Sequence, residues 1–257
     1  MRVIELLGPS GVGKTFLYQR LFETYTERRY MNVTEACIRA AEDLKLEFEF
    51  TRYYIYYLLF KSGLFKFKAY GLSKRLLIRD KNLLDVGEGY GLSFELLKKY
   101  LLTESNSNVS SKRMENFRRC AQLNFLLEKH LQKKEVVFFD EGVLHHHHGL
   151  NTSIAAQHTS DIKKDGALSP YAVVSCELSF EQLMDRVMKR KIAGVQTFSH
   201  KDLSGIKLEA YVHQNMLEYR EKVKALNMAG VPILTINTDD TVSKNLKTVH
   251  SFINNLI

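Results

Sequence analysis

Near the start of the chain, three glycines, a lysine and a threonine have the spacing of a phosphate-binding loop. The pattern G-x-x-x-x-G-K-[ST] is met by eight consecutive residues, Gly8, Pro9, Ser10, Gly11, Val12, Gly13, Lys14 and Thr15. In such a loop the backbone N–H groups converge on one anion, the lysine reaches the β- and γ-phosphates of a nucleotide, and the hydroxyl holds Mg²⁺. We therefore predict that this loop, with Phe16 beside it, binds ATP and that Thr15 is a magnesium ligand.

The residues on either side of this motif favour a strand before it and a helix after it. Val3 to Leu7 form an apolar run that is long enough for one strand, and residues 14–26 have the apolar spacing of a helix. A helix that starts near Gly13 points its positive end at the bound phosphates. The motif therefore stands in the structural context that its chemistry needs.

A pair of acids follows the next well-defined strand. Residues 135–140 carry four consecutive apolar side chains and close on Asp140, which is typical of a strand buried on both faces of a parallel sheet. We expect Asp140 beside the loop as a second magnesium ligand, and Glu141 as the general base for an acceptor. The sequence leaves open which acid has which role, and also whether Glu141 is simply a solvent-facing loop acid.

Two arginines four residues apart could bind the same polyphosphate. Arg186 and Arg190 share one face of a predicted helix, so both guanidinium groups can approach one ligand. We predict that they act with Lys14, Asp140 and Glu141 as the catalytic set. Residues 193–200 would form a mobile lid that excludes water; an ordinary charged surface helix is the alternative.

Four further residues are candidates for binding the second substrate. Arg118 and Gln122 share a face of the predicted helix 112–132, and Arg119 is adjacent, so they could clamp an acceptor through an ion pair and an amide. Glu35 follows the predicted second strand. Its alternative role is structural, because a glutamate is favourable in the first turn of any helix.

The histidine and cysteine patterns give little support to a metal centre. Residues 145–148 are four consecutive histidines, which point in several directions in any regular structure and cannot all bind one ion. We expect a structural or incidental role for them, although one could border the substrate. The three cysteines lack the spacing of a zinc cluster or a disulfide framework.

Strands alternate with helices along the chain, which predicts a parallel sheet with right-handed crossovers. The sequence between residues 34 and 134 predicts mostly helices, with a polar loop at 103–112. We expect one domain over residues 1–257, with a helical insertion at about 45–110 between the first helix and the strand that ends at Asp140. The predicted strands are 3–7, about 31–33, 135–140, 171–176 and 231–237. Further helices start near Ser179, where Ser179 and Gln182 have capping-box spacing, and cover about 206–228, with Gly230 as a stop, and 240–256.

The net charge of +8 predicts an anionic ligand or partner. Much of the basic character lies in residues 61–81, where lysines and arginines alternate with aromatic and aliphatic residues. The first interpretation of this segment is a solvated helical face. The alternatives are a site of peripheral membrane contact and a surface that captures an acidic substrate. No apolar run is long enough to span a bilayer, so we expect a cytoplasmic protein.

Together, the loop at residues 8–15, the acidic strand end at 140–142, the arginine pair and the final strand followed by Thr238-Asp239-Asp240 resemble the nucleoside and nucleotide kinase group of P-loop NTPases, with a thymidylate-kinase-like layout. The resemblance implies a three-layer α/β fold with about five parallel strands. It also implies ATP on the loop, Mg²⁺ at Thr15 and Asp140, an arginine lid, and adenine near the turn after Asn237. Members of the group carry Asp-Arg or Glu-Arg-Ser where this chain carries Asp-Glu, so the acceptor is left open.

We therefore predict a magnesium-dependent phosphotransferase that moves the γ-phosphoryl group of ATP to a small-molecule acceptor: a nucleoside, a nucleotide or a sugar-like compound. The alternative is a P-loop ATPase or switch that acts on a macromolecular partner, since an Asp-Glu pair at this strand end can also activate water. No nucleic-acid partner is expected, and the sequence leaves the oligomeric state open.

Overall fold

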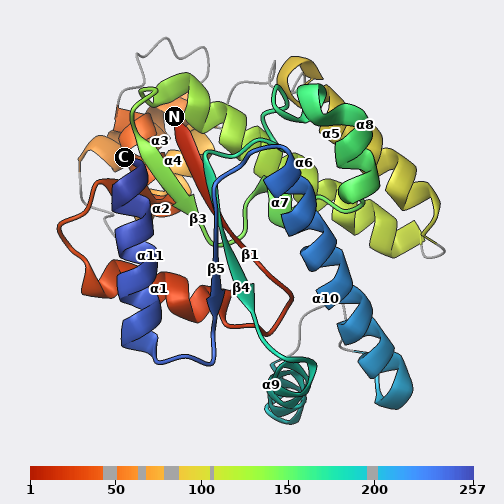
Figure 1. The fold of residues 1–257 in the computed structure, drawn as a ribbon. Coiled ribbons are helices and arrows are strands. Elements are labelled where there is room, and N and C mark those ends of the chain that lie inside the picture. Colours follow the sequence, from red (N-terminus) through yellow and green to blue (C-terminus); the bar gives the residue numbers. More distant parts are fainter. Residues whose placement is uncertain (43–50, 63–67, 78–86, 105–106, 196–201) are drawn as a thin grey trace.

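The computed structural model describes residues 1–42, 51–62, 68–77, 87–104, 107–195 and 202–257. In these residues a five-stranded parallel sheet has the strand order β2-β3-β1-β4-β5 (Figure 1). Its central strand, β1, pairs with β3 on one side and β4 on the other. The strands are β1 (Arg2–Leu7), β2 (Tyr30–Asn32), β3 (Val136–Phe139), β4 (Ala172–Glu177) and β5 (Ile233–Asn237).

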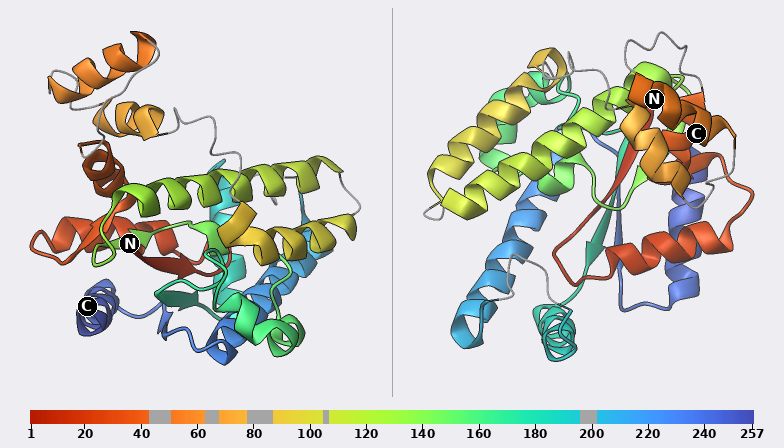
Figure 2. Two further views of the ribbon diagram at one scale, coloured as in Figure 1. Left: turned by 90° about the horizontal axis from the view of Figure 1, so that it is seen from above. Right: turned by 180° about the vertical axis from the view of Figure 1, so that it is seen from behind.

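Helices cover both faces of the sheet. Successive side chains of a strand point to opposite faces, and the central strands are largely apolar on both. In Figure 2, seen from above, α6 and α11 lie on opposite sides. Ile4 and Leu6 face the layer of α1, α9 and α11, whereas Val3 and Val137 face α2 and α6. The helices of the two main layers are α1 (Lys14–Thr24), α2 (Val33–Glu42), α5 (Gly87–Leu102), α6 (Ser107–His130), α7 (Val143–His146), α8 (Thr152–Ile162), α9 (Phe180–Ile192), α10 (Gly205–Met228) and α11 (Val242–Leu256).

Two further helices lie beyond the β2 edge of the sheet. Helix α4 (Ala69–Leu77) packs Leu76 and Leu77 against the small residues Ala36 and Ala40 of α2. Helix α3 (Thr51–Lys61) in turn packs on α4. The predicted insertion at about 45–110 therefore includes helices, but residues 45–50, 63–67, 78–86 and 105–106 lie outside the described part of the chain. The single-domain organisation stays a prediction.

The three-layer α/β fold expected from the resemblance is confirmed, with its five parallel strands. Local signals were also correct. Ser179 Oγ accepts from Gln182 N at 3.2 Å and Gln182 Oε1 accepts from Ser179 N at 3.1 Å, which completes the predicted capping box of α9. Gly230, at φ +83°, follows α10 as the predicted stop.

Two expectations need correction. The polar loop predicted at 103–112 is wrong for most of its length, because α6 already begins at Ser107. Its serines and asparagines are tolerated in the first turns, where backbone N–H groups lack helical partners. Helices α7 and α8 were missed; Asn151, which caps α8 by accepting from Ile154 N at 3.0 Å, was the available signal. Within the described residues, no helix is both long and apolar enough to cross a membrane.

Candidate active site

The loop between β1 and α1 has the backbone shape that an anion cradle needs. Gly8 has φ +145°, and a Cβ there would lie 2.5 Å from the carbonyl oxygen of Cys176 on β4. Gly13 is the N-cap of α1 at φ +106°. Both positions therefore require glycine, and they direct the first N–H groups of α1 toward the concave side of the loop.

Lys14 is held inside this loop and is only 5% exposed. Its Nζ donates to the carbonyl oxygens of Gly8 (2.7 Å) and Pro9 (3.3 Å). Burial lowers the pKa of the ammonium group, and the nearby carboxylates of Glu141 and Asp140 act in the opposite direction. The cation therefore lies next to the acidic pair at the end of β3.

Asp140 and Thr15 form a site that fits Mg²⁺. Asp140 follows β3, which pairs directly with β1, and its carboxyl is hydrogen-bonded by the Thr15 side chain. Asp140 Oδ1 is buried and has no protein partner. Burial raises the pKa of Asp140, whereas Thr15 and Lys14 lower it.

One carboxylate and one hydroxyl leave the remaining places of an octahedral ion to phosphate oxygens and water, which is how Mg²⁺ is commonly bound. Among the described residues no group of three or more His, Cys, Asp or Glu side chains could hold a metal by itself. The donor set at this position therefore suits an ion that arrives with a nucleotide.

Glu141 opens into a cavity of about 470 Å³, here called the Glu141 cavity. The loop contributes Ser10, and the walls come from α6, α7 and α10. Burial raises the pKa of Glu141, while the cations Lys14 and Arg190 lower it and Asp140 raises it. Besides Ser10 and Glu141 the cavity is lined by Val109, Lys112, Arg113, Asn116, His145, His146, His148, Asp202, Leu203, Tyr211, Asn215 and Tyr219.

A second cavity of about 410 Å³ adjoins the same loop and is here called the Phe16 cavity. Phe16, at the start of α1, and Val242, at the start of α11, contribute apolar surface, and both are exposed in this structure. Its other walls include α9 and the turn after β5. Besides Phe16 and Val242 it is lined by Gly11, Gly13, Leu17, Arg186, Lys189, Arg190, Thr238, Asp240 and Asn245.

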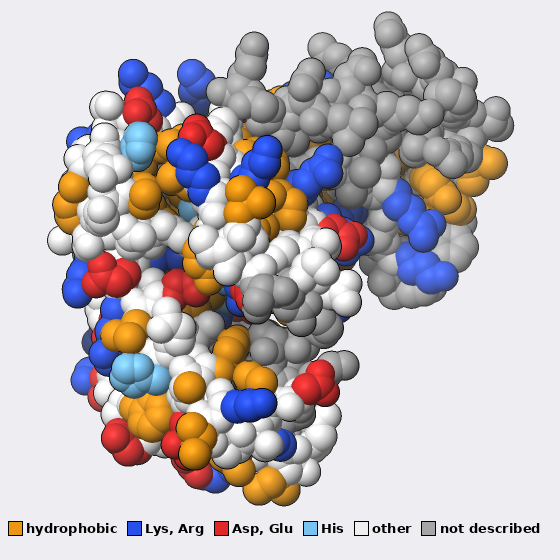
Figure 3. Space-filling model, turned by 90° about the vertical axis from the view of Figure 1, so that its right-hand side faces the viewer, with side chains coloured by type: hydrophobic (Ala, Val, Ile, Leu, Met, Phe, Trp, Pro, Cys, Tyr) orange, Lys and Arg blue, Asp and Glu red, His pale blue; other side chains and the backbone are white. Residues whose placement is uncertain are grey.

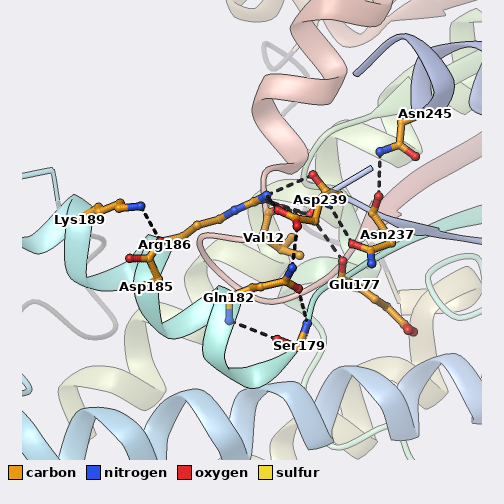
Figure 4. A network of polar contacts seen from close by, with 11 residues as sticks. Val12, Glu177, Ser179, Gln182, Asp185, Arg186, Lys189, Asn237, Asp239 and Asn245 are labelled. Atoms are coloured by element: carbon orange, nitrogen blue, oxygen red, sulfur yellow. Dashed lines mark hydrogen bonds and ion pairs between the residues drawn. The ribbon is translucent and has the colours of Figure 1, made fainter. Parts of the chain in front are cut away.

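The two arginines of α9 have different surroundings. Arg186 is tied to the loop and to the turn after β5 (Figure 4): Nη1 donates to Val12 O (2.9 Å) and Thr238 Oγ1 (3.2 Å), and Nη2 to Thr238 O (3.1 Å) and Asp239 Oδ1 (3.3 Å). Its guanidinium group therefore joins three segments of the protein.

Arg190 lies one turn further along α9. Its charge lowers the pKa of both Lys14 and Glu141, which places it near the acidic centre. The two arginines share a helix face, as predicted. Because the guanidinium group of Arg186 is hydrogen-bonded within the protein, Arg190 is the one of the two that could contact a charged ligand near Lys14. Of the predicted lid at 193–200, residues 196–200 lie outside the described residues.

The candidates on α6 lie elsewhere. Arg118, Arg119 and Gln122 line a separate, open pocket between α5 and α6 and do not border the Glu141 cavity. Arg119 is ion-paired with Glu115 at 2.5 Å. Figure 3 shows the side of the molecule that includes α5 and α6, with Lys and Arg side chains gathered among hydrophobic ones in its upper part.

Sequence reasoning missed the residues of α6 that do line the Glu141 cavity, which are Val109, Lys112, Arg113 and Asn116. The buried residues Phe117 and Ala121 show which face of this helix packs on the protein. Their apolar side chains were the sequence signal that could have shown on which side of the buried face each polar residue of α6 lies.

Glu35 has structural partners in this structure. It is ion-paired with Arg28, and its Oε2 accepts from Asn32 N at 3.0 Å. Asn32 Oδ1 in return accepts from Glu35 N at 2.8 Å. This reciprocal arrangement is a capping box at the start of α2.

The histidines of the 145–148 tract point in several directions, as expected. His147 Nε2 lies 3.1 Å from Ser93 O, and His148 Nδ1 lies 2.7 Å from Glu218 Oε1. His145, His146 and His148 border the Glu141 cavity, and His147 is fully buried.

Comparisons with known proteins found matches among solved structures. No protein-family model and no curated protein sequence matches it. The solved structures that match include deoxyadenosine kinase from M. mycoides with the products dCMP and a flexible dCDP bound, at 14% identity and a TM-score of 0.43, over 98% of this chain and 99% of that one.

The same enzyme with bound dATP matches at 15% identity and a TM-score of 0.42, over 99% and 100% of the two chains. A likeness at this identity and TM-score assigns neither a substrate nor a residue's role to this chain.

Proposed function

We propose that this protein is an ATP-dependent phosphotransferase that moves the γ-phosphoryl group to a small-molecule acceptor. The observation that carries the proposal is that two cavities adjoin one phosphate-binding loop, with Lys14 and the acids Asp140 and Glu141 at that loop. ATP would place its base in the Phe16 cavity and its phosphates on the loop. The acceptor would occupy the Glu141 cavity.

Glu141 is suited to act on the acceptor. Its carboxylate lines the cavity and its side chain is 48% exposed, so an acceptor hydroxyl can reach it. The carboxylate would take the hydroxyl proton as the acceptor oxygen bonds to the γ-phosphorus, and the bond from that phosphorus to the β–γ bridging oxygen would break, leaving ADP. An acceptor whose attacking oxygen belongs to a phosphate would need no such proton transfer.

The positive groups around the loop would stabilise the transferred phosphoryl group. The N–H groups at the start of α1, Lys14 Nζ and the Arg190 guanidinium would contact the γ-phosphate, and preorganised charge of this kind supplies most of the catalysis in this chemistry. Mg²⁺, held by Thr15 and Asp140, would neutralise charge on the β- and γ-phosphates.

The decisive experiment measures ATP consumption by the purified protein with Mg²⁺, alone and with a panel of nucleosides, nucleotides, sugars and sugar phosphates. Mass spectrometry would identify the products. We expect consumption only with an acceptor, together with a product heavier by one phosphoryl group. Steady hydrolysis that does not depend on any acceptor would contradict the proposal and favour the ATPase alternative.

Three other expectations stay predictions. Substrate binding by Arg118, Arg119 and Gln122 would have to take place in the pocket between α5 and α6. Substrate binding by Glu35 would require this side chain to give up its capping contacts. The cytoplasmic location is also untested. Peripheral membrane contact through residues 61–81 falls partly on 63–67 and 78–81, which lie outside the described residues.

A further inference from the structure

One histidine of the 145–148 tract lies between the candidate base and a buried tyrosine. His145 Nε2 is 3.5 Å from Glu141 Oε1, and His145 Nδ1 is 3.0 Å from the hydroxyl oxygen of Tyr219. The tyrosine belongs to α10 and is 74 residues further along the chain than His145. All three side chains line the Glu141 cavity.

The tyrosine decides which nitrogen of the imidazole carries the proton. When the Tyr219 hydroxyl donates to Nδ1, the ring proton must be on Nε2, the nitrogen that lies 3.5 Å from the Glu141 carboxylate. The opposite tautomer would direct an Nε2 lone pair at a carboxylate oxygen, which is repulsive. The arrangement is therefore a phenol that donates to a neutral imidazole, whose Nε2 lies 3.5 Å from a carboxylate oxygen.

The surroundings keep this imidazole neutral. Burial lowers the pKa of His145 well below its usual value, and the nearby Lys14, His146, Lys222 and His148 lower it further. The ring therefore favours its neutral form, which has one N–H to donate.

The two elements that carry the pair are anchored to each other. The Leu144 N–H on α7 donates to the buried carboxylate of Glu5 on β1, at 3.1 Å to Oε2. Lys222 Nζ, on α10, donates to Leu144 O at 3.0 Å and lies 4.7 Å from the centre of the Tyr219 ring. These contacts fix the distance between His145 and Tyr219 before any ligand binds.

We propose that His145 is a positioning residue for Glu141, and that Tyr219 sets the tautomer in which His145 orients the Glu141 carboxylate toward the acceptor. The inference rests on the proposed function for the role of Glu141. It distinguishes His145 from His147 and His148, whose nitrogens contact Ser93 and Glu218 instead.

The first test compares three variants in the phosphoryl-transfer assay. His145→Leu removes the donor, and we expect kcat to fall about tenfold to hundredfold with little change in KM for ATP, which is the cost of a misplaced catalytic group. His145→Gln places an amide N–H near the Nε2 position, so most of the kcat should return. Tyr219→Phe should lower kcat less than His145→Leu does, because the ring remains but its tautomer is no longer fixed.

Two matched controls separate positioning from general damage to the fold. His158→Leu makes the same change on α8, outside the Glu141 cavity, where the ring lies 3.6 Å from a carboxylate oxygen of Asp161. Tyr30→Phe removes a hydroxyl that lies 3.0 Å from His250 Nδ1, the same kind of bond in another part of the molecule. We expect both controls to keep the wild-type kcat.

The second test does not depend on activity. Long-range ¹H–¹⁵N correlation spectra of the histidine rings report which nitrogen carries the proton, and His145→Gln assigns the signal. We expect the Nε2–H tautomer in the wild type and a mixture of tautomers in Tyr219→Phe.

An Nδ1–H tautomer in the wild type, or a wild-type kcat in His145→Leu, would overturn the inference. If instead the wild type transferred no phosphoryl group to any acceptor, the proposed function would fail and the spectra alone would decide whether Tyr219 sets the tautomer.

Discussion

At the scale of single residues, the candidate site depends on charges that the protein has already partly desolvated. Lys14 is buried against its own loop, and Asp140 Oδ1 lacks a protein partner. An ion or a charged ligand in this position gains more than it would in water, because fewer solvent molecules screen it. The proposed binding of a polyphosphate and Mg²⁺ would use these desolvated charges.

Replacing Glu141 by glutamine tests its role as the base. Because an amide cannot take a proton, Glu141→Gln should lower the rate of phosphoryl transfer to a hydroxyl by about two orders of magnitude. The rate is measured with saturating ATP and acceptor. Glu23→Gln, on the exposed side of α1, is the matched control and should leave the rate unchanged. Full turnover by Glu141→Gln would remove this assignment.

Gly142 is required by packing rather than by its backbone angles, since its φ is −97°. A Cβ at this position would lie 2.5 Å from both carboxylate oxygens of Glu5. Gly142→Ala should therefore reduce the free energy of unfolding by about 1–3 kcal/mol, the usual cost of overpacking, as measured by denaturant unfolding.

Gly71→Ala on α4 is the control for that substitution. Nothing lies within 4 Å of a Cβ at Gly71, and alanine is the better helix former, so we expect a gain of about 0.5–1 kcal/mol. Equal stabilities of the two variants would contradict this view of the Glu5 contact.

At the scale of elements, helix α9 presents two arginines with different contacts. Both border the Phe16 cavity, but Arg186 connects the loop to the turn after β5, whereas the charge of Arg190 acts on Lys14 and Glu141. The capping box at Ser179 fixes the start of this helix, and Gln182 Nε2 donates to Asp239 Oδ2 at 2.6 Å. Together these contacts set the position of α9 relative to the loop.

The different contacts predict different kinetic defects. Lysine cannot reproduce the four contacts of the Arg186 guanidinium group, so Arg186→Lys should raise KM for ATP about tenfold, which corresponds to about 1.4 kcal/mol, with a small effect on kcat. Arg190→Lys should instead lower kcat by a similar factor with KM nearly unchanged. Steady-state kinetics over a range of ATP concentrations distinguishes the two patterns, and identical defects would refute the division.

At the scale of the whole molecule, buried ionisable groups connect the sheet to helices α7 and α10 behind the site. Glu5 on β1 is 2% exposed and Lys222 on α10 is fully buried. Between them lies α7, whose first turn donates N–H groups to Glu5 and whose Leu144 carbonyl accepts from Lys222. The helix that carries His145 and lines the Glu141 cavity is thereby attached to β1, the strand that enters the loop.

This arrangement predicts a pH dependence of stability. Burial raises the pKa of Glu5 from 4.5 to about 7, although N–H groups of Leu144, His145 and Val143 and the charge of Lys222 oppose the shift. Between these two pKa values the folded protein holds a proton that the unfolded chain releases. The contribution of Glu5 to stability is therefore fully present below about pH 4.5 and is lost as the pH rises through about 7.

Denaturant unfolding of the wild type and of Glu5→Gln at several pH values between 4.5 and 8 tests this. The difference between the two free energies of unfolding should change by about 3 kcal/mol across the range, in the direction that disfavours the wild type at high pH. A difference that is independent of pH would show that Glu5 ionises in the folded protein as it does in the unfolded chain.

The sequence by itself determined the features that arise from neighbouring residues. The phosphate-binding loop, the apolar strand that closes on Asp140, the capping box at Ser179 and the stop at Gly230 are local patterns, because backbone angles and first-turn hydrogen bonds depend on adjacent residues. The parallel order of the sheet followed from the alternation of strands and helices.

Only the tertiary structure decided which side chains meet. It directed Arg113 rather than Arg118 toward the Glu141 cavity, because the buried stripe of α6 sets the rotation of that helix. It also separated Arg186 from Arg190 and placed Tyr219 against His145 across 74 residues of chain. Such contacts follow from how α6, α7, α9 and α10 pack around the sheet. Packing brings together residues that are far apart in the sequence, and no local sequence pattern predicts those pairs.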